Sequence, residues 1–189
     1  MKVLKGVEHE NQEELEEVIQ ELSRYSWATL GLELPTDYET RRQFGVAAFF
    51  FGGLEQYAKK RKARVFPLES PSEYDYMQAL EIAKAVRDGR VSEETLVQNI
   101  EQVKTQKSPY VAPEQSYVNN HFLALYEKAH EILTECHSLD TILALCLKSY
   151  GKREQTMITN IRKDLPDIVV IGSGHAQNII GCLPEYTLV

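Results

Sequence analysis

The strongest strand signal of this chain is the stretch Asp167-Ile168-Val169-Val170-Ile171-Gly172-Ser173-Gly174-His175. Its apolar residues run continuously instead of alternating with polar ones, which is typical of a parallel strand buried on both faces. The segment that begins at Gly174 and His175 then indicates a short helix toward Cys182. A strand of this kind, followed directly by a helix, favours a sheet with helices on both faces.

The first third of the chain alternates strand and helix patterns in the same way. Strands are predicted over 1–6, 27–34 and 63–69, and helices begin at Asn11, which can cap with Glu14, and at Thr36, which can cap with Glu39. Pro67 places the third strand at a sheet edge or at its own end. The helix before it closes with the basic run 59–62, whose cations suit a helix terminus. The order predicts an α/β fold with a mostly parallel sheet and flanking helices.

The middle third shows helix patterns only. Helices are predicted to start near Ser70-Pro71 and Ser92 and to cover about 119–136 and 138–150, with a loop over 107–113 and a further helix over 152–163. We therefore expect one domain over 1–189 that carries a helical insertion at about 71–150. At 189 residues with 43% hydrophobic side chains, the chain is long enough for one sizeable core.

Charge and composition limit the classes of partner that we expect for this chain. The formal net charge of −7 disfavours a nucleic-acid partner, because the phosphate backbone attracts basic surfaces. No apolar run approaches the roughly 20 residues of a membrane helix, and no signal-peptide pattern precedes the first strand. The three cysteines are odd in number and lack Cys-x-x-Cys spacing, which favours reduced thiols. These features predict a cytoplasmic protein without a membrane partner.

Two short motifs stand at opposite ends of the chain, each after a predicted strand. They are Gly6-Val7-Glu8-His9 and Gly172-Ser173-Gly174-His175. The carboxyl ends of parallel strands meet at one edge, where open α/β sheets bind their ligands. His9, His175 and Glu33, at the end of the second strand, should therefore converge. Two imidazoles and a carboxylate suit a divalent transition metal such as Mn²⁺, Co²⁺ or Zn²⁺.

Glu33 lies between two leucines in a run that favours burial, and a buried carboxylate needs a partner. Arg153 leans toward the buried face of its predicted helix and can supply that partner, so an internal salt bridge is the structural alternative to a site. Glu69 ends the third strand and is a candidate fourth ligand or an acid/base group. Glu8 and Glu10 flank His9, and either could take its place.

Two other motifs carry less weight. Gly172-Ser173-Gly174 matches part of a dinucleotide-binding loop, but the third glycine is absent and too little chain follows for a nucleotide-binding half. Ser173 lacks the Gly-x-Ser-x-Gly setting of a nucleophile elbow. Neither pattern predicts a function here.

These motifs resemble the TraB superfamily, which groups the TraB/PrgY pheromone-shutdown proteins and the Tiki proteases, and more distantly the ChaN haem-binding lipoproteins and the erythromycin esterases. The resemblance covers the whole chain at the level of motifs: both Gly-x-x-His motifs, the strand-ending Leu32-Glu33-Leu34, and the helix start Arg153-Glu154-Gln155-Thr156-Met157.

The resemblance implies a metal-dependent hydrolase with a peptide or other small-molecule substrate. It implies that His9, Glu33 and His175 lie near the metal, that Arg153 orients a group or stabilises a developing anion, and that the glycines Gly6, Gly172 and Gly174 belong to the binding motifs. The alternative is a non-catalytic protein that binds a peptide, haem or another small ligand, of which haem is the less favoured. A third hypothesis is a structural polar cluster in a protein that acts through its surface as a homodimer.

Overall fold

The computed structural model describes residues 2–9, 11–35, 45–105 and 113–189. The chain divides into two compact units, which we call unit 1 (Met1–Pro71 with Arg153–Val189) and unit 2 (Ser72–Lys152). The sheet belongs to unit 1, whereas every element described in unit 2 is helical. The sequence predicts one domain with an insertion at about 71–150, and the structure gathers that insertion into a compact unit of its own.

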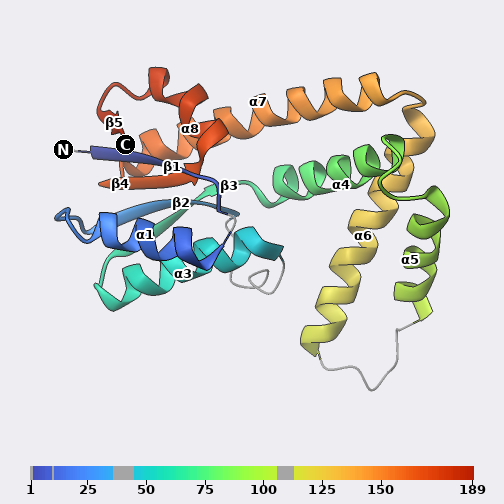
Figure 1. Ribbon diagram of the computed structural model, residues 1–189, viewed down its shortest axis with the longest axis horizontal. Coiled ribbons are helices and arrows are strands. Elements are labelled where there is room, and N and C mark those ends of the chain that lie inside the picture. The colour runs from blue at the N-terminus through green and yellow to red at the C-terminus, as the bar shows by residue number, and fades with distance from the viewer. Residues whose placement is uncertain (1, 10, 36–44, 106–112) are drawn as a thin grey trace. The chain divides into compact units, whose positions relative to one another are not determined.

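Unit 1 is built on a parallel sheet whose described strands stand in the order β3-β2-β4-β1-β5 (Figure 1). The strands are β1 (Lys2–Val7), β2 (Thr29–Pro35), β3 (Arg64–Glu69), β4 (Ile168–Gly172) and β5 (Tyr186–Leu188). This arrangement confirms the predicted α/β fold. In this sheet β1 and β4 are neighbours, since Val3 pairs with Ile168 and Val7 with Gly172.

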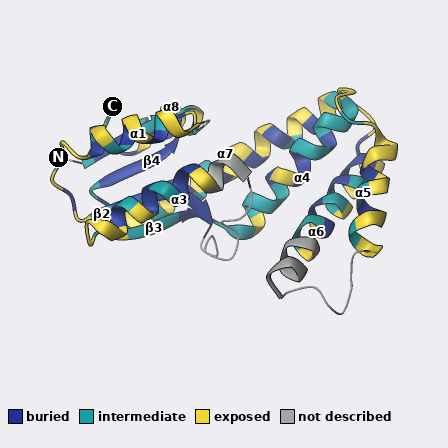
Figure 2. Cartoon of the chain, turned by 60° about the horizontal axis from the view of Figure 1, so that its bottom comes forward, coloured by how far each residue is buried: buried dark blue, intermediate teal, exposed yellow. Residues whose placement is uncertain are grey.

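Helices cover both faces of this sheet, which explains the continuous apolar run of β4. Side chains of a strand alternate between faces. Ile168 and Val170 accordingly pack in the core formed with α1 (Gln12–Leu22) and α3 (Gly45–Lys60). Val169 and Ile171 pack in the core formed with α8 (Ser173–Ile179) and the end of α7 (Leu139–Asp164). Every residue of β4 is buried, as Figure 2 shows.

The edges of the sheet are formed by its two least regular strands. β3 contains Pro67 and lies at one edge, as the missing N–H of proline predicts. β5 lies at the other edge and is not predicted from the sequence, because three residues are too few to show a period. Its anchor is Tyr186, which is buried and donates its hydroxyl hydrogen to the carbonyl of Pro166 at 2.7 Å.

Unit 2 has a separate hydrophobic core. Its helices are α4 (Pro71–Arg87), α5 (Glu93–Thr105), α6 (Pro113–Glu135) and the first part of α7. The buried side chains of this core come from residues 77–146 only, with Leu80, Leu133 and Ile142 among those fully buried. The predicted absence of strands between 71 and 150 is confirmed for the described residues.

Two helix boundaries differ from those predicted. The helices predicted over 138–150 and 152–163 are one helix, α7, which runs through Gly151. Glycine in a helix costs about 1 kcal/mol relative to alanine, and the buried side chains on either side, such as Cys146 and Met157, offset that cost by packing. α6 starts at Pro113 and not near 119. The Thr36–Glu39 capping box and the loop over 107–112 lie outside the described residues.

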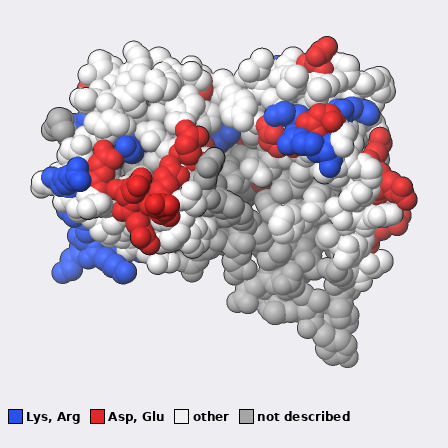
Figure 3. Space-filling view, in the orientation of Figure 1, with Lys and Arg blue, Asp and Glu red and all other residues white. Residues whose placement is uncertain are grey.

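Charged side chains are distributed unevenly over unit 1 (Figure 3). Acidic groups gather over α1, which carries Glu13, Glu14, Glu16, Glu17 and Glu21. The basic run ends α3, whose last turn holds Lys59 and Lys60, so its prediction as a helix terminus is confirmed. In the ranges that the structure describes, no helix has both the length and the apolar character that crossing a membrane requires.

Candidate functional site

The two Gly-x-x-His motifs meet at the carboxyl edge of the sheet because β1 and β4 are parallel neighbours. Gly172 marks the meeting point. A Cβ atom added there would lie 3.2 Å from Glu33 Oε2, 3.6 Å from His9 Nε2 and 3.8 Å from His175 Cδ2. The predicted convergence of these three side chains is therefore present in the structure.

His9 lies in the loop after β1 and adopts a left-handed backbone conformation with φ of 50°. For a residue other than glycine such a conformation costs energy and is held in place by its surroundings. The ring packs against Phe50 and Phe51 of α3, with centroids 6.5 Å and 5.7 Å away. The position of its imidazole is thus set by two aromatic side chains of α3.

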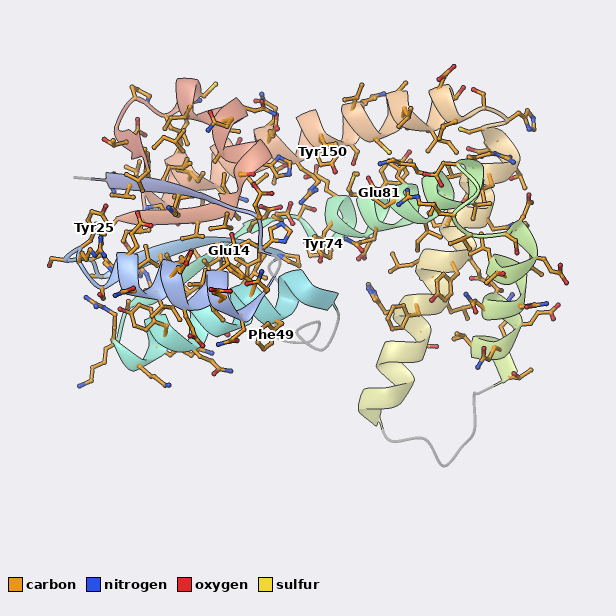
Figure 4. The ribbon with its side chains drawn as sticks, viewed as in Figure 1. Glu14, Tyr25, Phe49, Tyr74, Glu81 and Tyr150 are labelled. Atoms are coloured by element: carbon orange, nitrogen blue, oxygen red, sulfur yellow. The ribbon has the colours of Figure 1, made fainter. Side chains whose placement is uncertain are left out.

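Glu8 anchors the same loop from both sides. Its backbone N–H donates to Glu14 Oε1 at 2.6 Å, and its carboxylate accepts a hydrogen bond from the hydroxyl of Ser173. Glu14, labelled in Figure 4, stands in the first turn of α1, where Asn11 caps the helix as predicted. Glu8 therefore serves as a link between β1, α1 and α8, while Glu10 lies outside the described residues.

A buried ion-pair cluster lies next to the imidazole of His175. Arg153 donates from Nη2 to Glu33 Oε1 at 2.8 Å and from Nε to Glu69 Oε1 at 2.6 Å. Arg153, Glu33 and Glu69 expose only 7%, 8% and 1% of their surfaces. The predicted pairing of Glu33 with Arg153 is confirmed, and Glu69 joins the pair. Since the guanidinium already faces two carboxylates, orienting Glu33 is the role that this geometry favours for Arg153.

The second oxygen of Glu33 is held by the backbone. The N–H of Gly172 donates to Glu33 Oε2 at 2.5 Å. Glu33 reaches this position because Leu32 and Leu34 pack into the core with α1 and α3, so the side chain between them points to the opposite face. That face carries α7 and α8. The carboxylate is thus fixed at both oxygens.

His175 is buried at the start of α8 and faces two carboxylates. Its Nδ1 lies 3.1 Å from Glu154 Oε1, and its Nε2 lies 3.7 Å from Glu33 Oε1. Asn178, one turn further along α8, donates from Nδ2 to the same Glu154 oxygen at 2.8 Å. The imidazole is therefore held between α7 and β2.

The three glycines of the motifs differ in whether, and why, the structure requires a glycine at their positions. A Cβ on Gly6 would lie 3.1 Å from the Cα of Ser173 and 3.2 Å from the Cβ of Ala176, so Gly6 lets α8 pack closely on β1. Gly172 leaves room for the three converging side chains. Gly174 has nothing within 4 Å of an added Cβ, and no contact in the structure requires a glycine there.

The donor atoms suit a transition metal in kind. Two ligands of one ion at about 2.0–2.2 Å lie within roughly 4 Å of each other, and the 3.7 Å between His175 Nε2 and Glu33 Oε1 meets that condition. A carboxylate oxygen that accepts one hydrogen bond keeps a further lone pair. Among the described residues, however, no group of three or more His, Cys, Asp or Glu side chains is arranged so that it could hold a metal ion. Binding would therefore require these side chains to move.

Sequence reasoning missed the residues that hold the site in place. No sequence pattern predicts the contacts of Glu154 and Asn178 around His175, or the hydrogen bond from Ser173 to Glu8. One signal was available: His175 and Asn178 are three residues apart, which places both on one face of a helix. Their shared partner on α7 follows only from the tertiary structure.

No protein-family model, curated protein or solved structure matches this chain. The resemblance to the TraB superfamily stays a prediction from the motifs.

Proposed function

We propose that this protein is a metal-dependent hydrolase, with its centre at the carboxyl edge of the sheet in unit 1. His9, His175 and Glu33 would hold a divalent ion. The observation that supports the proposal is that all three side chains surround Gly172, although they come from three separate parts of the chain. The substrate that this chemistry suits is a peptide or another small amide or ester.

A bound divalent ion supplies two effects to a hydrolase: it polarises a carbonyl oxygen, and it lowers the pKa of water toward about 7. The protein groups around the ion have separate tasks. Arg153 and the Gly172 N–H orient Glu33, and Glu69 balances the charge of Arg153. Glu33 is a better candidate proton acceptor than Glu69, because Glu33 faces the imidazoles and Glu69 is almost completely buried.

Metal content tests this proposal directly. Protein purified without a histidine tag is analysed for metals, and its melting temperature is measured with and without Mn²⁺, Co²⁺ or Zn²⁺. We expect about one ion per chain and a rise in melting temperature, since a ligand that binds only the folded state stabilises it. The double variant His9→Ala/His175→Ala should lose both effects.

His137→Ala is the matched control, because His137 is exposed in unit 2 and should leave metal binding unchanged. If the wild-type protein binds no stoichiometric metal and no ion raises its melting temperature, the proposal is wrong. If the double variant His9→Ala/His175→Ala instead lowers the melting temperature in metal-free buffer, the cluster of His9, His175 and Glu33 is structural.

A non-catalytic binding protein is the second candidate. The observation that favours it is the mutual pairing of Arg153 with Glu33 and Glu69, which directs the guanidinium at the protein's own carboxylates. Under this alternative the edge would bind a peptide, haem or another small ligand without turnover. Titration with haem, followed near the Soret band, tests the haem version, and a flat titration would exclude it.

A further inference from the structure

Glu154 contacts His175 on the side away from Glu33. It lies on α7, next to Arg153, and its Oε1 accepts from Asn178 Nδ2 at 2.8 Å. The same oxygen lies 3.1 Å from His175 Nδ1. His175 and Asn178 both belong to α8, so one carboxylate oxygen ties two residues of α8 to α7.

The contacts of Glu154 bear on which ring nitrogen of His175 carries a proton. An ionised carboxylate can only accept hydrogen bonds, and the Asn178 amide already donates to it. The contact with Glu154 therefore requires a proton on Nδ1. In a neutral imidazole the other nitrogen, Nε2, then keeps its lone pair. Nε2 lies on the Glu33 side of the ring, 3.7 Å from Glu33 Oε1.

We propose that Glu154, held by Asn178, is a positioning residue that keeps the proton of His175 on Nδ1 and so directs the Nε2 lone pair into the site. This inference rests on the proposed function in assigning the use of Nε2, but the tautomer itself is independent of any metal. Histidine ligands of metal ions commonly donate their second N–H to a carboxylate, which fixes the ring and raises the basicity of the ligand.

The alternative is that Glu154 only fastens α8 to α7. A spectroscopic measurement separates the two roles. Nitrogen-15 NMR of the full chain, labelled at the histidine rings and free of metal, identifies the protonated nitrogen of each ring. His175→Gln assigns the signals of His175.

We expect the His175 ring to carry its proton on Nδ1 in the wild-type protein. In Glu154→Ala this preference should be lost, because the carboxylate that faces Nδ1 is removed. Gln155→Ala, which changes the neighbouring exposed side chain on the same helix, should retain the wild-type spectrum. Glu154→Gln keeps an amide oxygen at the same place and should retain much of the Nδ1 preference. If Glu154→Ala does not fold, the comparison of Asn178→Ala with wild type takes its place, and a weaker Nδ1 preference is expected.

A proton on Nε2 in the wild-type protein, or an unchanged Nδ1 preference in a folded Glu154→Ala variant, would overturn the inference. If the wild-type protein binds Zn²⁺, Glu154→Ala should weaken its affinity about 10- to 100-fold, as loss of such outer contacts commonly does. Absence of metal binding by the wild-type protein would reject the proposed function and leave the tautomer result standing. The two failures are thus distinguishable.

Discussion

Arg153 is the residue on which the buried charges of unit 1 depend. One guanidinium faces two carboxylates, and all three groups are almost fully buried. Removing one partner of a buried ion pair is costly because the remaining charge stays in a poorly solvated place. The cluster is consequently a determinant of stability as well as of the position of Glu33.

Arg153→Met should lower the free energy of unfolding by about 3–5 kcal/mol, because it leaves Glu33 and Glu69 without their cation. Urea unfolding at neutral pH measures the change. Lys152→Met is the matched control: Lys152 is the preceding residue, its side chain is 72% exposed, and it pairs with Glu73 at 3.3 Å. An exposed pair contributes only about 0–1 kcal/mol. Equal effects of the two substitutions would show that the buried cluster is not required.

Gly172 should be intolerant of a side chain for a reason specific to the site. In Gly172→Ala the new methyl group would lie 3.2 Å from Glu33 Oε2, and that carboxylate would have to shift by a few tenths of an ångström from the position that faces the imidazoles. We expect loss of metal binding, measured by thermal shift with Zn²⁺, in a protein that still folds. Gly174→Ala adds a methyl group in open space within α8 and should instead stabilise the fold by about 0.5–1 kcal/mol. Metal binding by Gly172→Ala at wild-type strength would contradict the location of the site.

At the scale of elements, Asp167 joins the starts of β2 and β4. Its Oδ2 accepts from the backbone N–H groups of Ala28 and Thr29 and from the Thr29 hydroxyl, at 2.8–3.0 Å. The N–H of Ala28, followed by the Thr29 groups, lowers the pKa of Asp167 below its ordinary value. The strong β4 prediction from sequence begins at this residue, but the contact of Asp167 with Ala28 and Thr29 could be identified only in three dimensions.

The lowered pKa predicts a pH-dependent contribution to stability. Because the pKa is lower in the folded than in the unfolded chain, the contribution is complete above the unfolded pKa of about 3.9 and is lost as pH falls through the folded pKa. Asp167→Asn should therefore destabilise the protein at pH 6 by about 1.5–3 kcal/mol, the range for hydrogen bonds to a charged group. The difference from wild type should shrink as pH falls toward 3 in urea unfolding. A difference that is constant over this range would contradict the assignment.

At the scale of the whole molecule, the hydrophobic cores follow the division into units. Two cores lie within unit 1, one on each face of the sheet, and the third lies within unit 2. No residue belongs to cores of both units in the described part of the chain. A segment with its own core can in principle fold alone.

We predict that the isolated fragment 72–152 folds. It should show a helical circular-dichroism spectrum and a cooperative thermal transition, although a core of this size supports only about 3–5 kcal/mol. Leu80→Ala, which truncates a fully buried side chain of this core, should abolish the transition, whereas Leu147→Ala should not, because Leu147 is 73% exposed. A fragment that is helical but melts without cooperativity would show that unit 2 depends on the rest of the chain.

The local pattern of the sequence was sufficient for most of the fold of unit 1. β1 to β4 and the helices between them were predicted because hydrophobic periodicity and caps act over a few residues. The convergence of His9, Glu33 and His175 was also predictable, because in a parallel sheet the carboxyl ends of the strands share one edge. Pairing of Arg153 with Glu33 followed from the cost of an unpaired buried charge.

Other features depended on contacts between residues far apart in the chain. Gly151 reads locally as a helix break, yet packing on both sides carries α7 through it. β5 is too short for a pattern and exists because β1 offers it a free edge. The bonds of Glu154 to His175 and of Glu8 to Ser173 join α7, β1 and α8. Local sequence determined which residues could form the site, and tertiary packing determined which atoms face one another, because that choice depends on side chains that the chain brings together only on folding.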